Sequence, residues 1–95
     1  MNRHDEKLAE QIQRLAAEFV NRQSSGQTFI TVTGLRWSDQ GRQANVQIGV
    51  WPKDKRTLGL EFARRQLGEL RQLVKERVRS RNIPWLDFEF GDGQE

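Results

Sequence analysis

The chain has 95 residues, of which 35% are hydrophobic and 31% are charged, and its formal net charge is +3. This length supports one hydrophobic core, so we expect a single domain over residues 5–90, with frayed termini at 1–4 and 91–95. There is no cysteine and a single histidine, His4. The composition therefore argues against a thiol nucleophile, a metal site, a cofactor or an enzyme.

Two features of the sequence fit a cytoplasmic protein. The absence of cysteine fits a reducing compartment, although small cysteine-free domains also occur outside cells, and the charged N-terminus lacks the apolar core of a signal peptide. No apolar run approaches the roughly 18 residues that a membrane span needs. The sequence pI near 10.0 indicates an anionic partner such as nucleic acid, although a basic surface can also serve solubility alone.

Residues 5–22 have the periodicity of an amphipathic helix that ends before Gly26. Its apolar positions recur every three or four residues, at Leu8, Ile12, Leu15, Ala16, Phe19 and Val20. The charges on this segment balance, so we expect the helix to pack rather than to bind a partner.

Two strands are expected next, joined as an antiparallel hairpin by a turn over residues 38–42. Residues 28–37 are rich in β-branched and aromatic side chains, and a bulge at Gly34 would bring Leu35 and Trp37 to the face of Ile30 and Val32. The second strand alternates apolar and polar residues from Ala44 to Val50, which predicts one buried face.

Residues 57–81 read as two helical pieces, with apolar positions at Leu58, Phe62, Leu67, Leu70, Val74 and Val78. One straight helix of this length would measure about 37 Å, longer than a small sheet, so we expect a bend within two residues of Gly68. Pro84 ends the helical stretch, and residues 85–90 form a third strand with Leu86, Phe88 and Phe90 on one face. These elements predict an α+β domain with three helices on one face of a three-stranded sheet.

The element order helix-strand-strand-helix-helix-strand resembles the type II KH-like domains, which bind single-stranded nucleic acid. Several motifs at matching places resemble ribosome-binding factor A, a bacterial family: Ile30-Thr31-Val32-Thr33, Ser38, Ala44, Val46, Gly68 between two helices, and Arg81-Asn82-Ile83-Pro84. The family's Ala-x-Gly joint is Gln66-Leu67-Gly68 here, so only the glycine matches.

This resemblance implies a function in ribosome biogenesis. A member of the family binds the ribosomal RNA of the small (30S) subunit without catalysis and assists its late maturation and processing. By this resemblance we expect a cytoplasmic monomer without a cofactor or a membrane association.

Positive charge is concentrated in residues 53–81, which hold ten Lys/Arg against four Asp/Glu. Arg71, Lys75 and Arg79 have i, i+4, i+8 spacing and would form a basic stripe along the second helical piece. Closely spaced cations suit RNA phosphates, whereas the simpler interpretation is a solvated helix face. With the resemblance, we predict that RNA is bound by Arg64, Arg65, Gln66, Gly68, Arg71, Lys75, Arg77, Arg79 and Arg81.

Glycine and tryptophan suggest further sites. Gly68 alone does not complete the Gly-x-x-Gly loop of KH domains, because residue 65 is Arg65, so a kink or close helix packing explains it better. Trp37, Trp51 and Trp85 would stack on unpaired bases if exposed, but core or edge packing is the simpler interpretation, with Trp51 and Trp85 at strand ends.

The alternative function is a protein–protein interaction module without RNA binding, which uses a strand edge or a tryptophan patch.

Overall fold

The computed structural model describes residues 3–23 and 28–91. Within this part of the chain the elements follow the predicted order: α1 (Arg3–Gln23), β1 (Phe29–Ser38), β2 (Gln43–Trp51), α2 (Arg56–Arg65), α3 (Leu67–Arg77) and β3 (Trp85–Phe90). Short 3-10 turns cover Asp39–Gly41 and Lys53–Lys55. The predicted α+β fold, with three helices and three strands in the described residues, is confirmed.

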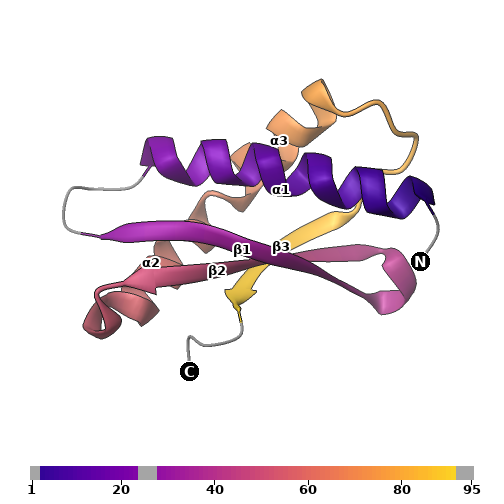
Figure 1. Cartoon of the computed structure of the whole chain (residues 1–95). Coiled ribbons are helices and arrows are strands. Elements are labelled where there is room, and N and C mark those ends of the chain that lie inside the picture. The colour runs from indigo at the N-terminus through magenta and orange to yellow at the C-terminus, as the bar shows by residue number, and fades with distance from the viewer. Residues whose placement is uncertain (1–2, 24–27, 92–95) are drawn as a thin grey trace.

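The described strands form one sheet in the order β1-β2-β3. β1 and β2 are antiparallel, as the hairpin prediction requires, whereas β3 runs parallel to β2, with Gln43 opposite Trp85. A parallel pair needs a crossover connection, and α2 and α3 supply it (Figure 1). Because β3 runs in this direction, its first residue, Trp85, lies beside the hairpin turn, although the two are far apart in the sequence.

The bulge predicted at Gly34 is present in β1. Val32 lies opposite Ile48, but Gly34 lies opposite Gln47 and Leu35 opposite Val46, so the register shifts between Val32 and Gly34. The shift returns Leu35 and Trp37 to the core face, where both are partly buried against the apolar cluster. The bulge thus lets β1 keep one apolar face along its whole length.

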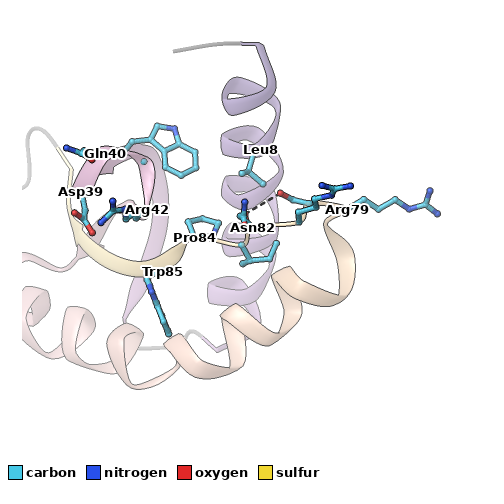
Figure 2. Close-up of a pocket in the computed structure, with 13 residues that line it drawn as sticks. Leu8, Asp39, Gln40, Arg42, Arg79, Asn82, Pro84 and Trp85 are labelled. Atoms are coloured by element: carbon cyan, nitrogen blue, oxygen red, sulfur yellow. Dashed lines mark hydrogen bonds between the residues drawn. The ribbon is translucent and has the colours of Figure 1, made fainter.

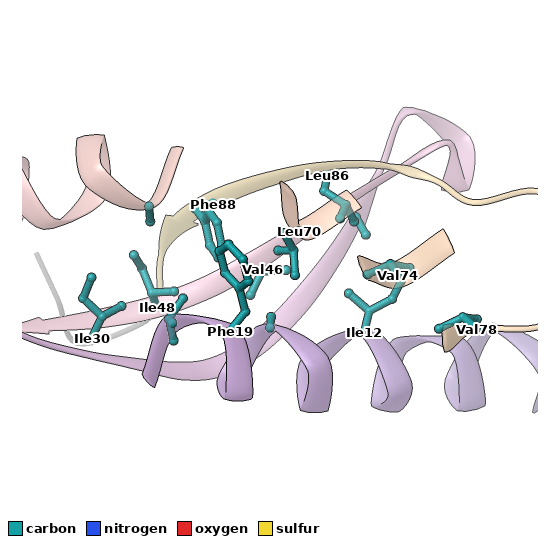
Figure 3. Close-up of a cluster of buried hydrophobic side chains, with 14 of the residues drawn as sticks. Ile12, Phe19, Ile30, Val46, Ile48, Leu70, Val74, Val78, Leu86 and Phe88 are labelled. Atoms are coloured by element: carbon teal, nitrogen blue, oxygen red, sulfur yellow. The ribbon is translucent and has the colours of Figure 1, made fainter. Parts of the chain in front are cut away.

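The core is built on one face of β2, the central strand. Its alternate residues Ala44, Val46, Ile48 and Val50 are all fully buried. A single cluster joins them to side chains from the other elements (Figure 3): Leu8, Ile12, Ala16, Phe19, Val20, Ile30, Ala63, Leu70, Val74, Val78, Leu86 and Phe88. All three described helices contribute to this cluster, so they cover the same face of the sheet, with α1 and α3 side by side (Figure 1).

The prediction that Leu58 faces the core is wrong. Leu58 is 59% exposed, and α2 instead turns its buried Gly59 and Ala63 to the sheet. A Cβ atom on Gly59 would lie 2.6 Å from Cγ1 of Val50. The small residues let α2 approach the sheet closely, which rotates Leu58 toward solvent.

The bend between the two helical pieces lies at Gln66, two residues before Gly68, as predicted. Gln66 has non-helical torsions (φ −95°, ψ 3°), and its N–H donates to Ala63 O at 3.0 Å, the tight pattern of a helix end. α3 then ends at Arg77, four residues earlier than expected, because Val78 takes an extended conformation (φ −104°, ψ 126°) and is buried in the core.

The described residues extend slightly beyond the predicted domain of residues 5–90 at both ends. Arg3 and His4 belong to α1, and Gly91 is buried and donates its N–H to Ile48 O at 3.0 Å. Residues 1–2 and 92–95, together with the predicted helix stop at Gly26, lie outside the described residues.

Candidate nucleic-acid interface

Two of the arginines predicted to bind RNA are held at the edge of β3. Arg64, in the last turn of α2, donates from Nη2 to Phe88 O at 3.0 Å and from Nε to Asp87 Oδ1 at 3.2 Å. Arg71, on α3, donates from Nη2 to Ile83 O at 3.2 Å and from Nε to Pro84 O at 3.4 Å. Among the described residues β3 has a neighbouring strand on one side only, so Arg64 supplies a donor at its open edge, while Arg71 bonds to the segment just before β3.

The predicted joint residues have different environments. Gln66 is half-buried at the bend, and Arg65 beside it is exposed. Gly68 is the second residue of α3 and is exposed, and a Cβ atom there would meet no atom within 4 Å. Of the two explanations for Gly68, close helix packing is therefore wrong, and the kink lies at Gln66, two residues before the glycine.

The stripe of three cations on one helix is not present, because Arg79 lies beyond the end of α3. Arg71 and Lys75 remain one turn apart on α3, and Lys75 and Arg77 are exposed. Within the described residues, Lys75 and Arg77 have no ion-pair partner: the salt bridges there are Arg36–Glu89 and Arg64–Asp87. Their charges are therefore available to an anionic partner.

Arg79 and Arg81 instead line an open groove between the α3–β3 connection and the hairpin turn, with a volume of about 1010 Å³. Arg42 lines the same groove from the other wall, and Figure 2 shows Arg42 and Arg79 on opposite sides of Pro84. The three arginines are exposed, and Asp39 is the acidic residue among the lining side chains. The groove is therefore cationic.

Arg42 was missed by the sequence analysis. It belongs to a turn, and no spacing in the sequence connects it to residues 79–81. Trp85 N–H donates to Arg42 O at 2.9 Å, so the parallel pairing of β2 and β3 brings Arg42 to the groove. The backbone of the turn is unusual as well: Asp39, Gln40 and Gly41 all have positive φ (51°, 55° and 84°).

The three tryptophans separate into one packed and two exposed residues. Trp37 packs against the core and lines the groove, and its buried Nε1 has no hydrogen-bond partner within the described residues. Trp51 is 51% exposed and Trp85 64% exposed. Both exposed residues lie at strand ends, as expected, and each has a cation over its ring, Lys53 at 5.9 Å and Arg71 at 4.2 Å from the centroid.

The sheet face opposite the helices carries a polar network. Arg36 on β1 donates from Nη2 to Glu89 Oε1 at 2.8 Å and from Nε to Oε2 at 3.0 Å, which links the two outer strands. Gln47 Nε2 also donates to Glu89 Oε2 at 3.0 Å. The hydrogen bonds from Arg36 hold the pKa of Glu89 below its usual value, against the opposing effect of partial burial. On this face the charges of Arg36 and Glu89 neutralise each other, so they are not available to an anionic partner.

The buried Asn45 forms a second hydrogen-bonded group on the same face, nearer the turn. It is 3% exposed, and its Nδ2 donates to Ser38 Oγ at 2.8 Å and to Arg36 O at 3.0 Å. Its Oδ1 accepts a hydrogen bond from Gln43 Nε2 at 2.7 Å. Because both ends of the amide have partners, Asn45 stabilises the hairpin near its turn.

Two further features concern the described residues alone. No group of three or more His, Asp or Glu side chains there is placed to hold a metal ion. No helix in this part of the chain is long and apolar enough to cross a membrane.

Comparison with known proteins gives structural matches only. No protein-family model matches the sequence, and no curated protein matches it. Three of the matching structures each cover most of the chain. The crystal structure of ribosome-binding factor A from Thermus thermophilus has a TM-score of 0.76 and 24% identity, and covers 90% of this chain and 94% of that one.

The other two structures carry related names. A solution NMR structure of a Thermotoga maritima protein, a candidate ribosome binding factor A, has a TM-score of 0.71 and 22% identity over 92% of this chain and 86% of that one. A homology model of the Thermus thermophilus factor, fitted into a cryo-EM map of a complex with the 30S subunit, has a TM-score of 0.64 and 26% identity over 87% and 90%. The helix order, the mixed sheet and these matches show that the chain has the fold of ribosome-binding factor A.

Proposed function

We propose that this protein is a non-catalytic assembly factor that binds the ribosomal RNA of the bacterial small subunit and assists its late maturation in the cytoplasm. The observation that carries the proposal is the structural match over 90% of the chain to ribosome-binding factor A. One of the matched structures was fitted into a complex with the 30S subunit, which supports the small subunit as the partner.

The exposed cations from the end of α2 onward support RNA as the partner that this surface contacts. Arg65, Lys75, Arg77, Arg79 and Arg81 are all exposed, and they follow one another from the end of α2, along α3, to the groove. RNA phosphates favour such closely spaced cations, since each contact releases counterions. Arg64 and Arg71 act on this surface indirectly, because their donors are engaged by β3 and the preceding loop.

Binding of this kind can assist maturation without a chemical step. A protein that binds one RNA conformation more tightly than another shifts the population toward the first by its difference in affinity. A rigid helical surface on a small sheet can make this distinction, because the positions of its cations are set by the fold. Assisting maturation by selecting a conformation requires no cofactor.

The test is cosedimentation of the protein with small ribosomal subunits in low and high salt. We expect binding to weaken steeply with salt. We also expect a triple variant, Lys75→Glu, Arg79→Glu and Arg81→Glu, to lose at least about tenfold in affinity at ~0.1 M salt. These side chains are exposed, so the melting temperature should change little.

A matched control reverses three other exposed cations, Lys7→Glu, Arg14→Glu and Lys53→Glu. It changes the net charge equally but leaves the proposed surface intact, so it should retain most of the affinity. Equal losses in both triple variants would show that only net charge matters. Absence of binding by the unchanged protein would refute the proposed function.

One observation favours the alternative of a protein-binding module. Phe29 and Trp51 lie opposite each other in the β1–β2 register and are 65% and 51% exposed. A contact made mainly by these rings would be insensitive to salt. Subunit binding that persists in high salt and is lost in Trp51→Ala would therefore support the protein-binding function.

A further inference from the structure

We infer that Trp85 is a preorganised stacking platform for an unpaired RNA base, with the neighbouring cationic groove holding the phosphates of the same strand. The inference rests on the proposed RNA-binding function and adds to it a second mode of contact, with single-stranded rather than structured RNA.

The first argument is the exposure of the ring. Trp85 begins β3 and is 64% exposed, whereas the next residue, Leu86, is 9% exposed and belongs to the core. In Figure 2 the Trp85 ring projects away from Leu8 and α1. A large apolar ring left in solvent contributes little to folding, but it presents a π-face to which any base can stack.

The second argument is that the ring is held in place. The guanidinium carbon of Arg71 lies 4.2 Å from the ring centroid, close enough for a cation–π contact. That guanidinium is itself bonded to Ile83 O and Pro84 O. One face of the indole is therefore covered by a group with its own partners, and the exposed area lies on the remaining face and edges. A base that stacks there meets a ring already ordered, which lowers the entropic cost of binding.

The third argument is the charge beside the ring. Trp85 is joined to Arg42 by the backbone hydrogen bond of 2.9 Å, and both line the groove with Arg79 and Arg81. A strand whose base stacks on Trp85 would have its adjacent phosphates near these arginines. Aromatic rings beside a cationic groove are the combination that single-stranded nucleic acid requires, whereas an apolar protein partner would leave these arginines unpaired.

Trp51 provides a matched control on the same protein. It is also an exposed tryptophan at a strand end with a cation over its ring, but Lys53 is 5.9 Å from the centroid. Trp51 does not line the groove. It lies at the end of β2 that is far from Gln43, the partner of Trp85 in the parallel register.

The experiment compares two fluorescently labelled RNAs by anisotropy: an unstructured oligouridylate and a blunt duplex of equal length. Trp85→Ala should weaken oligouridylate binding by at least about fivefold, since stacking of one base contributes that much or more. The duplex has no unpaired base, so its affinity should stay unchanged. Trp85→Phe should keep most of the oligouridylate affinity, and Trp51→Ala should bind both RNAs normally.

Quenching of tryptophan emission gives a second readout that does not depend on stability. The oligouridylate should quench the emission of Trp51→Phe much more strongly than that of Trp85→Phe, since both variants keep Trp37 in the groove and only the first keeps the stacking ring. Unchanged oligouridylate binding by Trp85→Ala would overturn the inference, and so would equal losses for oligouridylate and duplex. In both cases the proposed function would stand if subunit binding persists, whereas failure of the unchanged protein to bind any RNA or subunit would refute both.

Discussion

Glu89 illustrates how one side chain can connect two strands that do not touch. Its carboxylate accepts hydrogen bonds from Arg36 and from Gln47, so the ion pair passes over the central strand. Hydrogen bonding to Arg36 lowers the pKa of Glu89 in the folded protein. The folded state therefore stabilises the ionised carboxylate of Glu89 relative to the unfolded chain.

This lowered pKa predicts the pH dependence of a Glu89→Gln variant. At pH values above the ordinary glutamate pKa of about 4.3, the variant should be less stable than the unchanged protein, because the ion pair is lost. The difference should shrink as the pH falls through the lowered pKa of Glu89, where the unchanged protein loses the pair too. Urea denaturation over a pH series measures this difference.

Glu61→Gln is the matched control, since Glu61 is exposed on α2 and has no ion pair within the described residues. It should change stability little at any pH. A Glu89→Gln deficit that stayed constant down to strongly acidic pH would mean that the ion pair is not its cause.

At the scale of elements, the two helical glycines have opposite roles. Gly59 lies where α2 meets the sheet, and an added Cβ atom would lie 2.6 Å from a methyl carbon of the fully buried Val50. Gly68 lies on the exposed side of α3 with no atom within 4 Å of such a Cβ. Gly59 therefore allows α2 to pack closely on the sheet, whereas Gly68 only lowers the stability of α3.

The pair gives a prediction with an internal control. Gly59→Ala should lower the free energy of unfolding by about 1–3 kcal/mol, because a packed core cannot accept the added methyl without moving. Gly68→Ala should raise it by up to about 1 kcal/mol, because alanine favours the helix. Chemical denaturation of both variants tests this. A destabilising Gly68→Ala would show that the bend at Gln66 needs the glycine.

At the scale of the whole molecule, the described elements share one core. Every described helix and strand contributes a side chain to the buried cluster, and Leu70 on α3 is fully buried within it. A chain with one core of this kind is expected to unfold cooperatively. This supports the proposal that residues 5–90 are a single domain.

Leu70→Ala tests this cooperativity. The cavity should lower the free energy of unfolding by about 2–5 kcal/mol. The transitions followed by far-UV circular dichroism and by tryptophan fluorescence should still coincide. Two separate transitions would indicate that part of the chain folds independently of the shared core.

The parts of the fold that depend on local geometry were predictable from the sequence. The helical period of α1 and the alternation in β2 and β3 follow directly from backbone geometry, and the change of parity around Gly34 revealed the bulge. Two local predictions were wrong for tertiary reasons. Leu58 is exposed because the packing of Gly59 orients α2, and α3 ends early because Val78 enters the core.

The candidate site depended more on tertiary structure. The sequence by itself determined the excess of positive charge in residues 53–81 and the order of elements that carries it. Only the tertiary structure decided that β3 runs parallel to β2, which brings Trp85 next to Arg42. The tertiary structure likewise decided which arginines stay exposed without an ion-pair partner among the described residues, and which bond to β3 or to the loop before it. The physical reason is that hydrogen bonding at a strand edge depends on which strand lies beside it, and residues distant in the sequence meet only through that pairing.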